Sequence, residues 1–403
     1  MEIINIIAEV ILYSAFGLCL WTYLVYPFFV AVIGKLFRRS HFVGKITPSV
    51  TLIIPVHNEA TVLAEKINNS LLLDYPKGQL QIIVVSDGSN DGSDEIIKSF
   101  APRGVEYLRI PVRGGKPSAI NEAVKIARSE LLLLCDANTI FMHDVVKKLV
   151  RHFADESVGA VSGDVRLQGR GGVTAGEGIF WKIERMTQIG ESAIGSVIGV
   201  DGGMYMLRRE LYTPNKSDTL IDDFVIAMNV ANAGRRVLLD AQAIAIEDAV
   251  EDAGQEFRRR VRTIAGGFQS MFEGRGRPPL KNPFLLLAYI SHKALRWTGP
   301  VWLILLFASN LTVAAPALSQ PLDVHGGLLL SLLAMQIVFY LLAVAGHLQS
   351  KQNLPTALSF AYYFCLSNIA AIFGFIRWLR KSQSVTWLQA QRRVVVHANV
   401  ESK

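Results

Sequence analysis

The sequence predicts an α/β domain with a mostly parallel sheet, flanked at both ends by helices that cross a membrane. Two observations carry this prediction. Between residues 45 and 280, short β-rich runs alternate with helical runs, which is typical of parallel strands joined by crossover helices. Before and after this region the chain contains apolar stretches close to the ~20 residues that a membrane-spanning helix needs.

The composition agrees with this division of the chain. Hydrophobic residues make up 51% of the 403 residues and charged residues only 19%, which excludes a disordered chain. Three cysteines (Cys19, Cys135 and Cys365) cannot build a disulfide framework, and their apolar neighbours predict buried, reduced thiols. The net charge of +7 favours an anionic ligand or a membrane surface, and no nucleic acid partner is expected because aromatic residues do not interleave with the basic ones.

The first apolar stretch, residues 3–33, contains a single charged side chain and predicts a membrane anchor. A cleaved signal peptide is the alternative, but the stretch lacks a basic start and a small-residue cleavage site. Arg38, Arg39 and Lys45 follow it directly. By the positive-inside tendency, these residues place the next domain in the cytoplasm and the anchor in a bacterial-type inner or plasma membrane.

Further apolar stretches lie after residue 282. Three have spanning length and comprise residues 297–318, 326–347 and 356–376. Residues 283–296 are shorter and predict an amphipathic helix in the membrane interface, with a re-entrant element as the alternative. If all three longer stretches cross, the basic tail lies outside, against the positive-inside tendency, so the number of full crossings stays open.

These patterns predict four parts of the chain. A membrane anchor occupies residues 1–37, and a globular domain occupies residues 45–280. An interface helix and about three membrane segments follow at residues 281–380, and a basic tail ends the chain at residues 381–403. The globular domain is long enough to bury a substantial core as one unit.

The predicted strands of the globular domain end in polar or glycine-rich residues. We expect strands at residues 49–55, 81–85, 105–110 and 131–135, with helices between them. Ligands of open parallel sheets bind at the carboxyl ends of the strands. The repetition of polar residues at these ends therefore predicts one binding site.

Acidic and amide side chains mark three places in that site. Asp87 follows the second strand, where a turn or a helix cap is the alternative role. Asp136 and Asn138 follow the fourth strand one residue apart, and their oxygens suit Mg²⁺ or Mn²⁺, again with a helix cap as the alternative. Asp222 and Asp223 begin a helical run, where the helix dipole keeps a carboxylate ionised, as a general base requires.

Together and in this order, these residues resemble the membrane-embedded family-two glycosyltransferases, which include the cellulose, hyaluronan, chitin and poly-N-acetylglucosamine synthases. The matching stretches are IIPVHNE (53–59), VVSDGSNDGS (84–93), GGKPSAIN (114–121), LLLCDAN (132–138), VDGGMYMLRREL (200–211), IDDF (221–224) and FRRRVR (257–262). Each stretch is weakly specific by itself, whereas the ordered set is specific.

The resemblance implies a GT-A fold, a nucleotide-diphosphate sugar donor that is usually a UDP sugar, and Mg²⁺ or Mn²⁺ bound by Asp136 and Asn138. It further implies a contact of Asp87 with the uracil and a catalytic base at Asp223. The remaining residues expected to lie along the nucleotide sugar are Pro55, His57, Glu59, Lys116 and Arg260. The residues expected on the acceptor side are Asp201, Gly202, Gly203 and Asp222.

The sequence departs from the family pattern at several of these positions. Asn138 replaces an aspartate and supplies no negative charge. Asp222 replaces a glutamate, and Phe257 replaces a glutamine. Val261 replaces the tryptophan that helps bind the terminal acceptor sugar in the synthases, which speaks against processive elongation more than against sugar transfer.

Some further residues have a weaker claim to function. Trp181 and Glu184 lie one helical turn apart and line the acceptor path in one interpretation, although a packed tryptophan is the more common role. Asp164 and Glu247 are interpreted as structural or supporting residues. In the basic segment 258–281, a collar that meets anionic membrane lipid is one of two equally weighted interpretations for Arg258, Arg259, Arg275 and Arg277. Arg260 and Arg262 fall in the quoted motif and are interpreted as functional.

The predicted activity is an inverting, metal-dependent transfer of a sugar to a glycan acceptor, giving a β-linked exopolysaccharide, with accessory secretion proteins as expected partners. Non-processive transfer of one sugar to a lipid or lipid-linked acceptor is the first alternative. A catalytically inactive membrane scaffold is the second, and the retention of Asp87, Asp136 and Asp223 argues against it.

Overall fold

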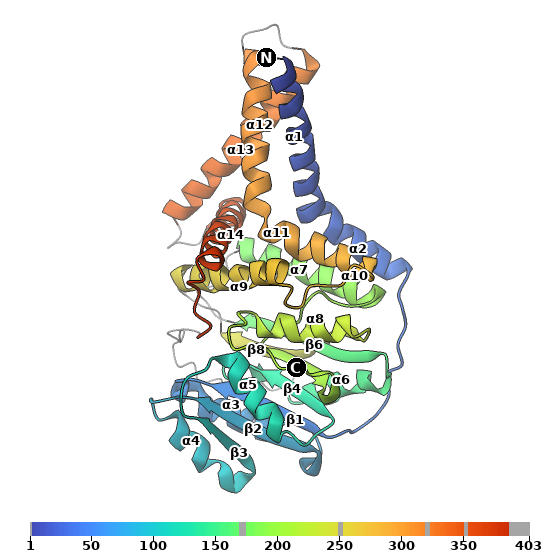
Figure 1. Ribbon diagram of the computed structural model, residues 1–403, viewed down its shortest axis with the longest axis vertical. Helices are drawn as coiled ribbons and strands as arrows, with labels where there is room; N and C mark the ends of the chain where they lie inside the picture. Colours follow the sequence, from blue (N-terminus) through green and yellow to red (C-terminus); the bar gives the residue numbers. More distant parts are fainter. Residues whose placement is uncertain (1, 169–174, 249–252, 319–322, 350–353, 387–403) are drawn as a thin grey trace. The chain divides into compact units, whose positions relative to one another are not determined.

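The computed structural model describes residues 2–168, 175–248, 253–318, 323–349 and 354–386, and Figure 1 shows their arrangement. Most of the basic tail predicted at residues 381–403 lies outside the described residues. The chain forms two compact units. The sheet unit comprises Ser40–Arg170, Gly199–Gln255 and Ser384–Lys403, and the helical unit comprises Met1–Arg39, Gly171–Ile198 and Glu256–Gln383.

The sheet unit is built on a sheet with the strand order β3-β2-β1-β4-β7-β6-β8-β5. The strands are β1 (Val50–Val56), β2 (Leu80–Asp87), β3 (Val105–Ile110), β4 (Leu131–Cys135), β5 (Ile140–Phe141), β6 (Val158–Gln168), β7 (Met204–Arg208) and β8 (Arg236–Asp248). Strands β1 to β4 confirm the four strands predicted from the sequence.

The first half of the sheet is parallel and the second half is mixed. β1 pairs in parallel with β2 and β4, and β2 pairs in parallel with β3. β7 runs antiparallel to both β4 and β6, and β5 runs antiparallel to β8. β6 and β8 are parallel to each other. The carboxyl ends of β1, β2 and β4 therefore lie along one edge, as the functional prediction requires.

Helices lie between the strands. They are α3 (Ala60–Leu71), α4 (Ser93–Ser99), α5 (Lys116–Ile126), α6 (Val145–Val150) and α8 (Asp222–Asn232), and α8 is buried on nearly all sides. In α3 the buried residues are Leu63, Lys66, Ile67 and Ser70, which is the spacing of one face of an α-helix. A lysine on this buried face is unusual, and its partners lie near the candidate site described below.

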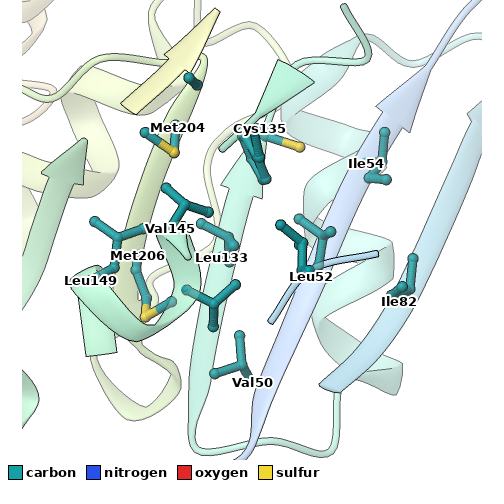
Figure 2. Close-up of a cluster of buried hydrophobic side chains, with 14 of the residues drawn as sticks. Val50, Leu52, Ile54, Ile82, Leu133, Cys135, Val145, Leu149, Met204 and Met206 are labelled. Carbon is teal, nitrogen blue, oxygen red and sulfur yellow. The ribbon is translucent and has the colours of Figure 1, made fainter. Parts of the chain in front are cut away.

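Side chains from neighbouring strands form a continuous buried layer, shown in Figure 2. Across the sheet, Leu52 of β1 pairs with Leu133 of β4, and Leu133 pairs with Met206 of β7. Val145 and Leu149 of α6 belong to the same cluster, and all five side chains are fully buried. This packing fixes the strands whose ends bear the polar residues.

The helical unit contains the apolar stretches. Its helices are α1 (Glu2–Leu20), α2 (Tyr26–Leu36), α7 (Ala175–Ile194), α9 (Ala253–Glu273, from residue 256 onward), α10 (Pro283–Tyr289), α11 (Leu295–Trp297), α12 (Gly299–Ala314), α13 (Val324–Leu348) and α14 (Thr356–Leu379). π-helical turns at Trp21–Val25 and Ile290–Ala294 join α1 to α2 and α10 to α11.

Four helical stretches in the described part of the chain are long and apolar enough to cross a membrane. They are Ile3–Leu36, Gly299–Ala317, Val324–Leu348 and Thr356–Leu379. Each coincides with a stretch predicted from the sequence. Leu12 of α1, Leu306 of α12 and Leu333 of α13 belong to one buried cluster, so these helices pack on each other.

The prediction of three buried thiols is correct for Cys135 and wrong for the other two. Cys135 is buried, whereas Cys19 and Cys365 are half-buried, and all three are free. The reason is that an apolar residue in a membrane helix satisfies its hydrophobicity in lipid as well as in protein. Apolar sequence neighbours therefore do not predict burial inside the protein for such a helix.

The buried layer of Figure 2 generates a stability prediction. Replacing Leu133 with alanine removes a fully buried side chain and should lower the free energy of unfolding by about 2–5 kcal/mol, because a cavity remains. Thermal unfolding of the detergent-purified protein measures this change. Leu72→Ala is the matched control, since Leu72 is 67% exposed, and an equal loss in both variants would contradict the assignment of the core.

Candidate functional site

The loops that follow β1 and β2 are hydrogen-bonded to each other. Asn58 accepts a hydrogen bond from the backbone nitrogen of Asn90 through its side-chain oxygen, at 2.9 Å. The backbone nitrogen of Glu59 donates to the hydroxyl of Ser93 at 3.1 Å. Asn58 has a φ of 56°, a left-handed conformation that asparagine tolerates better than most residues. The two strand ends therefore form one rigid platform.

Asp87 joins a third loop to this platform. Its side chain is fully buried, and its two carboxylate oxygens accept hydrogen bonds from the backbone nitrogens of Gly114 and Gly115, each at 2.7 Å. Gly115 has a φ of 86°, which favours glycine. His57 hydrogen-bonds through Nδ1 to the Asp87 carbonyl oxygen at 2.6 Å. The predicted uracil contact of Asp87 stays a prediction, whereas its hold on the Gly114–Gly115 loop is a structural finding.

Lys116, the first residue of α5, lies among the predicted carboxylates. Its Nζ is 2.5 Å from Asp136 Oδ1 and 3.5 Å from the carbonyl oxygen of Gly202. Burial disfavours the charged form of Lys116, but the carboxylates of Asp136, Asp222 and Asp223 outweigh burial and raise the pKa of Lys116 above its ordinary value. The sequence-predicted residues Lys116, Asp136 and Gly202 are therefore brought together.

Asp223 lies in the first turn of α8 beside Gly202. Its Oδ1 accepts a hydrogen bond from the backbone nitrogen of Phe224 at 2.7 Å. A Cβ atom on residue 202 would lie 2.3 Å from Asp223 Oδ2, so only glycine leaves room for this carboxylate. Burial and the neighbouring Asp222 raise the pKa of Asp223 to about 6. The stabilisation of the anion expected from the helix dipole is thus outweighed by desolvation and like charge.

Two buried polar atoms near Asp223 have no hydrogen-bond partner among the described residues. They are Asp222 Oδ2 and the hydroxyl oxygen of Tyr205. Asp222 is 3% exposed and Tyr205 is fully buried. Burial, followed by the charges of Asp222 and Asp223, raises the pKa of Tyr205 well above its ordinary value. An unsatisfied buried polar group costs about 1–3 kcal/mol, and such groups concentrate where a ligand completes the hydrogen bonding.

The turn after β4 carries Asp136 and Asn138. The Thr139 hydroxyl donates to the carbonyl oxygen of Asp136 at 2.9 Å. The Asn138 amide nitrogen donates to Glu247 Oε1 at 2.8 Å. The carboxylate and amide oxygens of this turn are the donor types that Mg²⁺ and Mn²⁺ prefer. In the described part of the chain no three acidic, histidine or cysteine side chains converge on one point, so a cation here would complete its shell with phosphate or water oxygens.

The acceptor-side residues predicted from the sequence form a tight loop before β7. The backbone nitrogen of Asp201 donates to the Ser162 hydroxyl at 3.0 Å, and Asp201 Oδ1 accepts from the backbone nitrogen of Gly203 at 3.2 Å. A Cβ atom on residue 203 would lie 2.9 Å from Thr139 Cγ2. The loop therefore packs against the turn that carries Asp136.

Arg260 belongs to the helical unit, where it has its own partners. Its guanidinium pairs with Glu256 at 2.8 Å and donates to the hydroxyls of Ser367, at 3.1 Å, and Tyr363. The neighbouring departures from the family pattern are packed side chains. Val261 is 1% exposed, and the ring of Phe257 contacts that of Phe373 at a centroid distance of 5.8 Å. The expected contact of Arg260 with the nucleotide stays a prediction.

Sequence reasoning missed Asn121 of α5, although it lies inside a quoted motif. Its Oδ1 accepts hydrogen bonds from the Tyr212 hydroxyl at 2.6 Å and from the backbone nitrogen of Asn215 at 3.1 Å, and its Nδ2 donates to the Asn215 carbonyl oxygen at 2.8 Å. This side chain fastens the segment that leads to Asp222. Both the oxygen and the nitrogen of the Asn121 amide form hydrogen bonds, so the side chain holds this segment in place. The motif alone does not show these partners.

Glu184, weighed above as an acceptor-path residue, lies in a buried ion cluster of the helical unit. His292 bridges Glu184 at 2.9 Å and Glu191 at 2.8 Å, and Lys293 and Arg296 also pair with Glu184. Burial alone would raise the pKa of Glu184, but these cations lower it well below its ordinary range. Trp181 is half-buried, and its ring nitrogen has no hydrogen-bond partner among the described residues.

Comparisons with known proteins identify the sheet unit. Residues 51–213 match the family model Glycosyl transferase family 2. The chain is 23% identical over 304 residues to a poly-beta-1,6-N-acetyl-D-glucosamine synthase of Staphylococcus epidermidis, covering 72% of either chain. A synthase of the same name from Staphylococcus aureus (strain COL) is 24% identical over 230 residues, and this match spans 55% of either chain.

A solved structure gives the same result for the fold. A mannosyltransferase from Pyrobaculum calidifontis, determined in complex with GDP-Man and Mn²⁺, has a TM-score of 0.67 and 22% identity, and the match covers 94% of this chain and 100% of that one. The predicted GT-A fold with a mostly parallel sheet is confirmed. Over residues 51–213 the chain is similar to glycosyl transferase family 2, and it is a glycosyltransferase.

Proposed function

We propose that this chain transfers a sugar, with inversion, from a nucleotide-diphosphate sugar to the hydroxyl of a glycan acceptor at a membrane. The observation that carries the proposal is the cluster of Lys116, Asp136 and Asp223 at the carboxyl ends of the strands. It combines a cation for a phosphate leaving group with a carboxylate whose pKa is near 6. The relatives named as N-acetylglucosamine polymer synthases support a glycan product.

Asp223 acts as the general base in this proposal. A base must take the proton of the acceptor hydroxyl while the anomeric carbon is attacked. Asp223 is held by the backbone nitrogen of Phe224, and only glycine at position 202 leaves room for its Oδ2. One base and direct attack on an α-linked donor give a β-linked product. The unpartnered oxygens of Asp222 and Tyr205 are available to hydroxyl groups of the acceptor or donor sugar.

The positive side of the site stabilises the departing diphosphate. Lys116 supplies one charge, and a divalent cation held by Asp136 and Asn138 would supply Lewis-acid stabilisation of the phosphate oxygens. The mannosyltransferase with the same fold was determined with Mn²⁺ and GDP-Man, which supports a divalent cation and a nucleotide-sugar donor. We propose a UDP sugar as donor and Mg²⁺ or Mn²⁺ as the cation.

The membrane context is also part of the proposal. The four helical stretches long enough to cross a membrane, together with Arg38, Arg39 and Lys45 after the first of them, support a cytoplasmic sheet unit at an inner or plasma membrane. The product would then be made on the side where nucleotide sugars are present.

Processive elongation and single transfer make different products. The buried Val261 occupies the motif position of the tryptophan that helps bind the terminal acceptor sugar in the synthases, which favours single transfer to a lipid or lipid-linked acceptor. The relatives named as polymer synthases favour elongation, and we retain elongation as the main proposal. Radiolabelled products made by purified protein in lipid vesicles separate the two: a ladder or long polymer means elongation, and one discrete product means single transfer.

The assignment of the base is tested by Asp223→Asn. We expect UDP release from UDP sugar to fall by at least ~100-fold, the lower range for loss of a general base, while UDP binding changes little. Asp144→Asn is a matched control, because Asp144 is half-exposed and pairs with Lys148 at 2.8 Å, outside the cluster. Undiminished turnover in the Asp223 variant would refute this role.

The pKa of Asp223 also predicts the pH dependence of the reaction. A general base must be ionised, so kcat/KM should rise with pH and level off above about 6, the pKa to which burial and Asp222 bring this carboxyl. Initial rates between pH 4.5 and 8 measure the profile. In Asp222→Asn the neighbouring charge is removed, so the midpoint should move to lower pH. A midpoint that does not respond to this substitution would argue against Asp223 as the titrating base.

A further inference from the structure

Glu247 is brought to the Asp136–Asn138 turn by a strand pairing. The two residues of β5 follow the turn directly, and β5 runs antiparallel to β8 with Ile140 opposite Ile246. Because antiparallel partners run in opposite directions, the residue after Ile246 faces the residues before Ile140. Glu247, near the end of β8, therefore lies beside Asn138, although 109 positions separate them in the sequence.

The contact between these two side chains is directional. The Asn138 amide nitrogen donates to Glu247 Oε1 at 2.8 Å. An asparagine amide has one oxygen and one nitrogen on opposite branches. Because Glu247 holds the amide nitrogen, Oδ1 of Asn138 points away from Glu247. Glu247 thus decides which end of this amide a ligand at the turn meets.

The turn is held from its other side as well. Lys66 of α3 is fully buried, and its Nζ donates to the carbonyl oxygen of Thr139 at 2.7 Å. The Thr139 hydroxyl donates to Asp136 and lies 3.1 Å from the carbonyl oxygen of Gly203. These contacts fix the backbone of the turn. The orientation of the Asn138 side chain is then set by its hydrogen bond to Glu247.

The charges at the turn leave a role for a second carboxylate. Asp136 pairs with Lys116 at 2.5 Å, and Asn138 is neutral. The side chain of Lys66 also lies behind the turn. Glu247 is the acidic side chain that contacts Asn138, and it places a negative charge where Asn138 itself supplies none. Carboxylates that hydrogen-bond a metal-binding side chain both orient it and strengthen its binding.

We propose that Glu247 is a positioning residue for the divalent cation: it orients the Asn138 oxygen toward the cation and supplies the negative charge that the amide lacks. This inference rests on the proposed function, because that function places a cation at Asp136 and Asn138. It concerns this chain's own pairing of an amide at position 138 with an acid at position 247.

The test measures Mn²⁺ binding to the full-length protein in detergent, with UDP present, by the electron paramagnetic resonance signal of free Mn²⁺ after subtraction of a UDP-only titration. Glu247→Gln keeps an acceptor for the Asn138 amide but removes the charge. We expect its Kd for Mn²⁺ to rise by ~10-fold or more, the range typical for a partner of a metal ligand. Asp248→Asn, the same charge change on the next residue of β8, should leave the Kd unchanged, because adjacent strand residues point to opposite faces.

A second pair of variants keeps the test independent of folding. Asn138→Asp alone puts two carboxylates in contact, and their repulsion should cancel most of the gain in charge. Combined with Glu247→Gln, it places the acid at 138 and the amide at 247, and Mn²⁺ affinity should return to that of the unaltered protein or exceed it. Melting temperatures of all variants show whether each one is folded.

The outcomes separate this inference from the proposed function. If the unaltered protein binds Mn²⁺ and Glu247→Gln binds it equally well, the role of Glu247 is overturned while the proposed function stands. The same holds if the double variant binds no better than Glu247→Gln. If the unaltered protein binds no Mn²⁺, the metal dependence of the proposed function fails, and this inference fails with it.

Discussion

The ion pair between Lys116 and Asp136 is the interaction on which the rest of the site depends. Three carboxylates, those of Asp136, Asp222 and Asp223, act on this single buried ammonium group. The Lys116 side chain is 12% exposed and the Asp136 side chain 37% exposed, so the ammonium group depends more on its carboxylate partners than on water. Because one cation cannot fully stabilise three anions, burial and the neighbouring Asp222 raise the pKa of Asp223 to about 6. The excess of carboxylates over ammonium groups therefore gives Asp223 a pKa that suits a general base near neutral pH.

The loops around this pair are fixed by side chains that bond to backbone. Asp87 holds Gly114 and Gly115 at the start of α5 and so places Lys116. Asn121, one helical turn and a little further along α5, holds the segment that leads into α8. Lys116 and the segment that leads to Asp223, the proposed base, are therefore both held in place by α5. The parallel half of the sheet provides the supporting edge, since β1 and β4 are buried throughout and polar residues follow at their carboxyl ends.

The helical unit uses its charges differently. His292 lies between Glu184 and Glu191 with both ring nitrogens engaged, and Tyr26 donates to Glu191 at 2.9 Å. These side chains come from α2, α7 and the π-helical turn before α11, so the cluster joins segments from three parts of the chain. Buried charges of this kind must be paired, which explains why acidic and basic residues persist beside strongly apolar helices.

The sequence by itself determined the local structure and the chemistry of the single positions. Strands β1 to β4, the helices after them and the four apolar stretches were predictable, because apolar periodicity and turn residues act over short distances. The ordered motifs also indicated Lys116, Asp136 and Asp223. Only the tertiary structure decided how these groups act on one another. The raised pKa of Asp223, the bidentate hold of Asp87 and the pairing of Asn138 with Glu247 each depend on contacts between segments that are distant in sequence, and burial, which sets their strength, exists only once the sheet has formed.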